Sequence, residues 1–360
     1  MSSRELDAVA ASIEPRGGRA LWARLRANHP ARVGAALVAA LVVFVVAGPI
    51  VAPHDAYTSD FVNGASPLRT PIGPSRDFWL GADRVYRDEF ARVAVGGRLS
   101  LVIGVVATGI ATLLGALVGI VAGWFEGTDG VRVPWGVILA ALLAFASGVE
   151  GHTTLAGFCA AACVAGIAGA IALPAEGPAL QALRRGPQVN IDVILMRTVD
   201  VGLAFPFLLL VMAVGAALDR TTPVTVIAVL GLTGWLGTAR VVRTKTMQVR
   251  ALDFVVAARA LGRPTAGVLW HHVLPNVSGL LIAVATVSVA QMILAESVLG
   301  YLGVGIAPPQ PTWGRMVMEG QDLLMAVPWL VLAPAGAIVL AVVGFHLLGE
   351  GLRDALDPRG

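Results

Sequence analysis

Residues 253–276 read DFVVAARALGRPTAGVLWHHVLPN, a polar segment that carries two arginines, a glycine near its middle and Leu-Pro near its end. Long uncharged runs lie on both sides of this segment. Polar stretches between long apolar runs are typical of loops that join membrane spans. We therefore expect residues 253–276 to be offered to a soluble partner at the surface of a membrane.

The composition of the whole chain agrees with a membrane location. Its 360 residues are 56% hydrophobic and only 14% charged, with a mean hydropathy of +0.78. Soluble domains carry roughly 25% charged residues. The net charge of +3 is too small to indicate nucleic-acid binding. The sequence therefore predicts an integral membrane protein of the all-α class.

Spanning helices need roughly 20 mostly apolar residues. Eight runs without Asp, Glu, Lys or Arg approach or exceed this length, so about eight spans are expected. They are 33–52, 99–125, 133–149, 153–175, 201–218, 221–239, 273–295 and 323–349. The fifth is expected to begin earlier, near Ile191, and to be kinked by Pro206, which removes a backbone hydrogen bond.

Lys and Arg in short loops predict the orientation, because such loops stay in the cytoplasm. The N-terminal segment 1–32 holds six arginines, and the loop 240–272 holds five arginines and Lys245 against one acid, Asp253. The loop 53–98 also holds six arginines, but they are balanced by acids, and it is expected outside. Both termini, including the tail 351–360, are therefore expected in the cytoplasm.

Sequence motifs for chemistry are missing from the chain. The single lysine follows Thr244, so there is no Walker A motif, and neither HExxH nor GxSxG occurs. Cys159 and Cys163 share a helix face but lack further metal ligands nearby, so we expect a packing role and no metal site. No enzyme activity is predicted for this chain.

Two features inside the spans concern packing and charge. Gly115, Gly119 and Gly123 form a stripe on one helix face, and such stripes let helices approach closely in lipid. Glycine is also common in membrane helices without this role, so both interpretations stay open. Asp200 lies near a membrane edge with Arg197 one turn away, and the two are expected to pair.

Several blocks together carry a resemblance to a known family. Asp253–Gly262 followed by Leu274-Pro275 resembles the EAA loop of ABC importer permeases. The chain is similar to the second permease subunit of the dipeptide/oligopeptide/nickel type over roughly 20–127 and 190–360. The further blocks are LGADRVYRD (80–88), GGRLSL (96–101), LMRTVDVGLAFPFLLL (195–210), GWLGTARVVR (234–243), LAESVLGYLGVGIAPPQPTWGRM (294–316) and LLGEGLRDALDPR (347–359).

The resemblance implies a six-span permease core into which two further helices are inserted. The core would comprise 33–127, with the external loop 53–98, and 191–350, with the cytoplasmic coupling loop 240–272. The insertion, 128–190, would cross the membrane outward and back and leave the later topology unchanged. We expect it to be peripheral and without a direct role in substrate passage.

Particular residues of the coupling loop follow from the same resemblance. The residues expected to engage an ATPase are Asp253, Val256, Ala257, Ala258, Arg259, Gly262, Leu274 and Pro275. Val256 stands where the family has a glutamate, so that contact must be absent or supplied by Asp253 or by the partner. Tyr86 stands where the family has glycine, a departure to which the sequence assigns no consequence.

The function implied is ATP-driven import of peptides or a similar small solute by a multi-pass protein of the bacterial inner membrane. The expected partners are a second permease, two cytoplasmic ATPase subunits and an external substrate-binding protein. ATP and magnesium would bind the ATPases, so no cofactor is expected in this chain. A secondary carrier that works without ATPases is the alternative. Nickel, glutathione-like and oligosaccharide substrates stay open.

Overall fold

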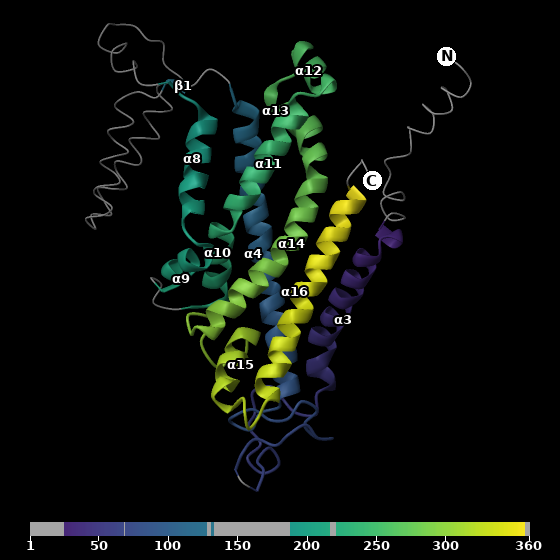
Figure 1. The fold of residues 1–360 in the computed structure, drawn as a ribbon, viewed down its shortest axis with the longest axis vertical. Coiled ribbons are helices and arrows are strands. Elements are labelled where there is room, and N and C mark those ends of the chain that lie inside the picture. The colour runs from purple at the N-terminus through teal and green to yellow at the C-terminus, as the bar shows by residue number, and fades with distance from the viewer. Residues whose placement is uncertain (1–24, 68, 128–130, 133–187, 217–220, 357–360) are drawn as a thin grey trace, which may run out of the picture.

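A computed structural model describes residues 25–67, 69–127, 131–132, 188–216 and 221–356 of the protein (Figure 1). Within these residues the regular secondary structure is helical apart from one short pair of strands. Its elements are α3 (His29–Val51), α4 (Glu89–Phe125), β1 (Val131–Arg132), β2 (Gln188–Val189), α8 (Ile191–Ala204), α9 (Phe207–Ala216), α10 (Pro223–Thr233), α11 (Trp235–Arg250), α12 (Asp253–Ala260), α13 (Thr265–Val268), the π-helix η1 (Leu269–Val273), α14 (Leu274–Tyr301), α15 (Trp313–Gly320), the 3-10 helix η2 (Gln321–Leu323) and α16 (Trp329–Leu356).

Among the described residues, five helical stretches are long and apolar enough to cross a membrane, and a bent pair of helices makes up to six. The five are α3, α4, α10 with α11, α13 through α14, and α16. They correspond to five of the apolar runs in the sequence, and the bent pair corresponds to a sixth. The two other predicted spans, 133–149 and 153–175, lie outside the described residues.

The helices extend further than the apolar runs that predicted them. The predicted loop 53–98 already contains the first ten residues of α4, and the predicted loop 240–272 contains the last turns of α11. The difference arises because hydropathy marks the apolar part of a helix and not its ends. Charged side chains near a helix end can reach water or a partner while the backbone stays helical.

The helix α4 is the central element of the bundle, and it packs against α11, α14, α10 and α3. One contact with α3 also explains how a proline is accommodated. Pro49 lies inside α3 and has no N–H to donate to the carbonyl of Val45. Arg98 of α4 donates from Nε to that carbonyl at 2.6 Å, and from Nη2 to the carbonyl of Val46 at 2.7 Å. Arg98 of α4 thus supplies the hydrogen bond that Pro49 cannot give to the carbonyl of Val45 in α3.

The bent pair lies where the sequence places a proline. α8 begins at Ile191, as expected, and ends at Ala204, and α9 starts at Phe207 at an angle of 86° to it. Pro206 lies in the break between them, so the predicted kink is confirmed. The predicted span 201–218 is therefore the end of one helix and the start of another rather than one straight helix.

The two ends of the predicted insertion meet in the structure. β1 and β2 pair antiparallel, with Val131 opposite Val189 and Arg132 opposite Gln188. The chain thus returns after residue 187 to the place it left at residue 132. The predicted helices between these strands lie outside the described residues.

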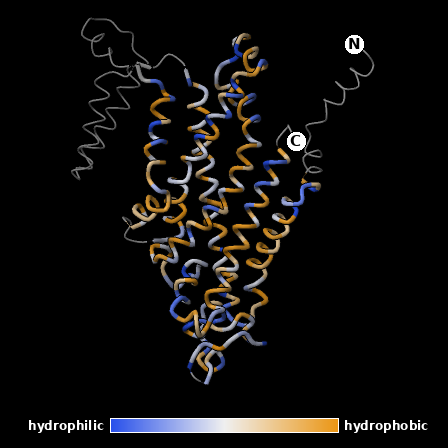
Figure 2. The backbone as a smooth tube through the Cα atoms, viewed as in Figure 1, coloured by the Kyte–Doolittle hydropathy of each residue, from blue (hydrophilic) through white to orange (hydrophobic). Residues whose placement is uncertain are grey.

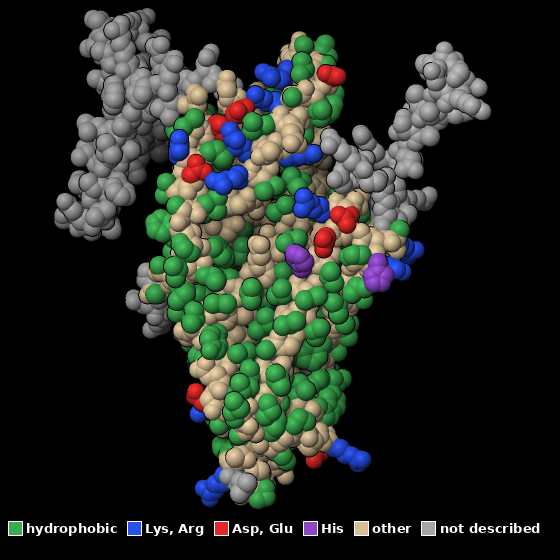
Figure 3. All heavy atoms as spheres, in the orientation of Figure 1, with side chains coloured by type: hydrophobic (Ala, Val, Ile, Leu, Met, Phe, Trp, Pro, Cys, Tyr) green, Lys and Arg blue, Asp and Glu red, His purple; other side chains and the backbone are tan. Residues whose placement is uncertain are grey.

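The bundle has two polar ends and an apolar middle. The first turn of α3, the last turns of α16 and the whole of α12 lie at one end, while α15 and the connection from α3 to α4 lie at the other (Figure 1). Asn28 Nδ2 donates to Asp354 Oδ2 at 3.3 Å, which ties the start of α3 to the end of α16. Hydrophobic residues dominate the middle of the tube (Figure 2), and charged side chains gather toward both ends (Figure 3).

Aspartates shape the connection between α3 and α4. Asp55 and Asp60 each accept backbone N–H groups that lie two and three residues ahead, and these bonds lower the pKa of both carboxyls. Asp88 is the N-cap of α4 and accepts from the N–H of Ala91 at 3.2 Å. Burial raises the pKa of Asp88 above its ordinary value of 3.8.

The connection between α3 and α4 also shows how a tyrosine is accommodated at residue 86, where the related family has glycine. Tyr86 has a φ of +63°, in the left-handed region that glycine enters without steric cost. Its hydroxyl donates to the carbonyl of Arg69 at 2.9 Å, and its ring meets Phe61 edge-on with centroids 5.5 Å apart. The side chain thus makes contacts that offset the strain of a conformation in which the related family has glycine.

We expect Tyr86→Gly to change the free energy of unfolding by less than about 1 kcal/mol, because relief of the strained φ offsets the lost hydrogen bond. Tyr86→Val is expected to cost about 2 kcal/mol more, because a β-branched residue is least tolerated at positive φ. Thermal unfolding of both purified variants measures the difference. Equal stabilities would show that the backbone conformation at residue 86 does not matter.

Candidate coupling site

The short helix α12 and the chain on either side of it form the candidate site. α12 begins at Asp253, whose carboxylate lies in the first turn, where the helix dipole favours a negative charge. It ends in a Schellman motif: Gly262, with a φ of +78°, donates to the carbonyl of Arg259, and Arg263 donates to that of Ala258. The glycine therefore fixes where α12 stops and how the chain turns away.

The two faces of α12 have different environments. Val255 and Ala258 are buried in a cluster with Trp124, Val242 and Val249, so this face is held by the rest of the chain. Helical geometry places Asp253, Val256, Ala257 and Ala260 on the opposite side, and all four are exposed. Val256 exposes 52% of its surface, and neighbouring Leu261 exposes 88%.

Two arginines connect this site to the end of α4. Arg250 Nη1 donates to the carbonyls of Trp124 and Glu126 at 2.6 and 2.8 Å, which satisfies backbone oxygens left open where α4 ends. The guanidinium of Arg259 lies over the indole ring of Trp124, 5.4 Å from its centroid. A displacement of α12 would therefore directly change the contacts at the end of α4.

The segment after Gly262 leads back into the bundle. Arg263 Nη1 lies 3.1 Å from His272 Nε2, and the ring of His272 lies beside that of Phe254, with centroids 5.9 Å apart. Leu274 and Pro275 are the first two residues of α14, which follows the π-helix η1 without a break. In the described part of the chain, no group of His, Cys, Asp or Glu is arranged to hold a metal.

The glycine stripe of α4 faces α11, the helix that leads into α12. A Cβ atom at Gly115 would lie 2.7 Å from Thr238, and one at Gly123 would lie 2.6 Å from the carbonyl oxygen of Arg243. A Cβ atom at Gly119 would lie 2.5 Å from the carbonyl oxygen of Ala239. Real Cβ atoms do not come so close to a backbone oxygen. The two helices therefore approach closely along this stripe.

The charged pairs beside α11 differ from the sequence prediction. Asp200 does not pair with Arg197 one turn away; its carboxylate instead accepts from Arg240 Nη2 at 2.6 Å. Arg243 donates two hydrogen bonds to Asp192, from Nε at 2.6 Å and from Nη2 at 2.7 Å. Both pairs join α8 to α11, so both acids of α8 have their partners on another helix.

Sequence reasoning assigned no role to Trp124, Arg243 or Arg250. The arginines were counted only as charges that set the orientation. The position of Arg250 in the last turn of α11 was a usable signal, because an arginine there can reach the open carbonyls of a neighbouring helix end. Which helix end would be in reach depends on the packing of α4 against α11.

Comparison with known proteins covers nearly the whole chain. The family described as binding-protein-dependent transport system inner membrane component matches residues 179–359. The family described as N-terminal TM domain of oligopeptide transport permease C matches residues 18–68. The first match includes α8 through α16 and thus all of the candidate site.

Individual relatives are 30% identical to this chain over most of its length. The oligopeptide transport system permease protein OppC of Bacillus subtilis is 30% identical over 336 residues, which cover 93% of this chain and 88% of that protein. The dipeptide transport system permease protein DppC of the same organism is 30% identical, with 94% and 84% covered. The glutathione transport system permease protein GsiD of Escherichia coli is also 30% identical, with 94% and 89% covered.

Proposed function

Because this chain belongs to the binding-protein-dependent transport system inner membrane component family, we propose that it is the permease subunit of an ATP-driven importer, with α12 as the contact for a cytoplasmic ATPase. The transported solutes are peptides or similar small molecules, in line with the names of its relatives. It is a multi-pass protein of the inner membrane.

The observation that carries this proposal is the two-sided character of α12. One face is fixed by Val255 and Ala258 within the chain's own apolar cluster, while Val256, Ala257 and Leu261 are exposed at a polar end of the bundle. Exposed apolar groups clustered at such a place mark a surface for a partner. Small side chains on the outer face let a groove in the partner approach the helix backbone.

Val256, which stands where the family has a glutamate, restricts the chemistry of the ATPase surface that can lie opposite it. A valine side chain accepts no hydrogen bond, so the ATPase surface opposite it must be apolar. Asp253 lies on the same face one turn earlier and supplies the carboxylate that the family carries at the later position. A basic group on the ATPase would therefore meet Asp253 rather than residue 256.

Motion of α12 would pass to the rest of the permease through α11 and α4. Arg259 of α12 and Arg250, the last residue of α11, both contact the end of α4, and the glycine stripe keeps α11 against α4 over about two turns. Closure of the ATPases on ATP would displace these elements together and switch access from one end of the bundle to the other. ATP and magnesium bind the ATPase subunits, not this chain.

The remaining partners are a second permease and an external substrate-binding protein. The second permease covers part of the exposed apolar surface of the bundle and completes the pathway. The binding protein delivers solute at the end opposite α12, beside α15. Both termini and α12 then face the cytoplasm.

Uptake into proteoliposomes tests the energy source. We expect a complex of this chain with its second permease, ATPases and binding protein to take up a labelled peptide only with ATP and magnesium. Uptake should persist when ionophores dissipate ion gradients, because no gradient drives it. Omission of the ATPases is the matched control and should abolish uptake. Gradient-driven uptake by this chain without ATPases would contradict the proposal and favour a secondary carrier.

A further inference from the structure

Gln291 is an exposed polar residue in the middle of a membrane span. It lies in α14, ten residues before the end of that helix, which is about 15 Å along the helix axis. Two residues later, Ile293 packs at the middle of the bundle, where a Cβ atom at Gly104 of α4 would lie 2.5 Å from its side chain. The apolar layer of a bilayer is about 30 Å thick, so Gln291 lies well inside it.

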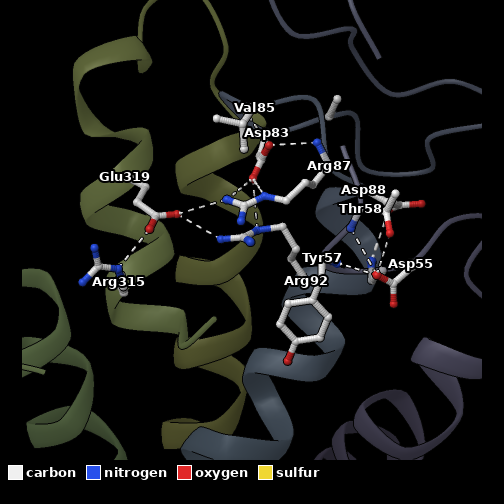
Figure 4. Close-up of polar contacts among 12 residues, drawn as sticks. Asp55, Tyr57, Thr58, Asp83, Val85, Arg87, Asp88, Arg92, Arg315 and Glu319 are labelled. Atoms are coloured by element: carbon white, nitrogen blue, oxygen red, sulfur yellow. Dashed lines mark hydrogen bonds and ion pairs between the residues drawn. The ribbon is translucent and has the colours of Figure 1, made fainter. Parts of the chain in front are cut away.

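Charged groups at the end of the bundle opposite α12 show how polar side chains can be compensated within this chain (Figure 4). Arg87 donates from Nε to Asp83 at 2.7 Å, and Arg92 donates from Nη2 to Glu319 at 3.0 Å. The side chain of Gln291, by contrast, forms no hydrogen bond with any residue that the structure describes. Its amide is therefore open to whatever surrounds the exposed face of α14.

Lipid is an unfavourable environment for this amide. A glutamine side chain carries two N–H bonds that donate and a carbonyl oxygen that accepts, and acyl chains can bond to none of them. Burial of an unbonded amide in hydrocarbon is costly. The exposed face of α14 around Gln291 therefore adjoins polar groups or water in the assembled importer.

The break between α8 and α9 lies at the same depth as Gln291. Near the end of α8, a Cβ atom at Gly202 would lie 2.6 Å from Leu236 of α11. Two residues before Leu236, a Cβ atom at Gly234 would meet the side chain of Met292, the neighbour of Gln291. The first residue of α9 also packs against the apolar cluster that contains Met292.

This break adds exposed backbone at that depth. Phe205 and Pro206, between the two helices, are both exposed. Pro206 has no N–H, and the last carbonyls of α8 lack the partners that a continuing helix would supply. Irregular backbone within the apolar layer occurs only where protein covers it or where it borders water. Gln291 and the break are thus two independent indications of a polar region in the middle of the bundle.

We propose that Gln291 and the break between α8 and α9 border the solute pathway, and that the Gln291 side chain forms hydrogen bonds with amide groups of a passing peptide. This inference rests on the proposed import function and adds the chemistry by which the solute is recognised. A glutamine amide can donate to a peptide carbonyl and accept from a peptide N–H. Because both partners are uncharged, the contact does not select peptides by the charge of their side chains.

Cysteine labelling tests the location of Gln291. The complete complex carries Gln291→Cys in a Cys159→Ser, Cys163→Ser background, and is treated with a positively charged methanethiosulfonate reagent. We expect Gln291→Cys to react about tenfold or more faster than Val43→Cys, without nucleotide or after trapping with ATP and vanadate, because thiolates form in water and not in lipid. Val43 is the matched control, since it is 64% exposed in the apolar middle of α3. Equally slow reaction of both cysteines in both states would overturn the proposal.

Uptake of labelled trialanine into proteoliposomes tests the contact itself. Gln291→Leu keeps a similar size but removes the amide, and should lower ATP-dependent uptake by about three- to tenfold, the loss expected for one neutral hydrogen bond. The complex should still assemble and hydrolyse ATP. Gln291→Asn keeps an amide and should take up more trialanine than Gln291→Leu.

The outcomes separate this inference from the proposed function. If wild type imports trialanine and Gln291→Leu does so equally well, the role of Gln291 is overturned while the import function stands. Loss of the second permease from the Gln291→Leu complex would also overturn it and make Gln291 a contact between subunits. Absence of uptake by wild type would count against peptide import itself. The cysteine reaction needs no transported peptide and would then still decide whether Gln291 borders an aqueous path.

Discussion

Ala257→Trp is expected to lower ATP-dependent uptake by about tenfold or more, the loss expected if at least about 1.4 kcal/mol of docking free energy is removed. Ala257 is exposed on the outer face of α12, where the proposed ATPase groove must come close to the backbone. An indole ring at this position would hold the two surfaces apart. The fold should be unaffected, because the buried face of α12 is formed by Val255 and Ala258.

The measurement is peptide uptake and ATP hydrolysis in proteoliposomes that contain the complete complex. His29→Trp is the matched control, because His29 is exposed at the same end of the bundle but lies on α3. The control should transport normally. Normal transport by Ala257→Trp, with the variant folded and assembled, would contradict the assignment of α12 as the coupling helix.

Gly262→Val tests α12 by changing the turn that ends the helix rather than its exposed outer face. A β-branched residue with a φ of +78° costs on the order of 1–3 kcal/mol, so the Schellman turn is expected to open and reorient α12. Uptake should fall in this variant as well. No other atom lies within 4 Å of a Cβ atom at this position, so the loss would come from the backbone and not from a clash.

Gly119→Leu is expected to destabilise the protein by at least about 1–3 kcal/mol, the usual cost of overpacking a core. The first atom of the new side chain would lie 2.5 Å from the carbonyl oxygen of Ala239 and 2.7 Å from Val242, so α4 and α11 must separate. Since α11 leads into α12, uptake should fall together with stability. Thermal unfolding in detergent and the yield of folded protein measure the first effect.

Gly109→Leu provides the control on the same helix. Gly109 is exposed, and a Cβ atom there would have no neighbour within 4 Å. This variant should be as stable as wild type or more stable by up to about 1 kcal/mol, because leucine favours a helix over glycine. Equal destabilisation by both substitutions would show that loss of glycine itself, rather than the approach of α11, is responsible.

The local structure of the coupling segment was predictable because short-range chemistry decides it. Three alanines followed by a glycine favour a short helix over Asp253–Leu261 that ends at Gly262. The structure has α12 from Asp253 to Ala260, with Gly262 at positive φ. The break at Pro206 was predictable for the same reason, since proline cannot complete the backbone bonds of a straight helix.

Long-range pairing was not predictable from spacing along the chain. Asp200 was expected to pair with Arg197 on its own helix, yet it pairs with Arg240, forty residues away. Arg92 and Glu319 are 227 residues apart and form an ion pair that no local pattern suggests. Salt bridges form between groups that the packed helices bring together, and a nearby residue in the sequence has no advantage if it faces elsewhere.

The sequence by itself determined the class of the protein, the apolar runs that become spans, the helix end at Gly262 and the family to which the chain belongs. Each of these depends on composition or on residues within a few positions of one another. Only the tertiary structure decided which face of α12 is free, that α11 lies against the glycine stripe, and that Gln291 is exposed in the middle of a span. These features depend on the packing of α4 against helices distant in sequence, because the exposure and the partners of a side chain are set by whichever helix covers it.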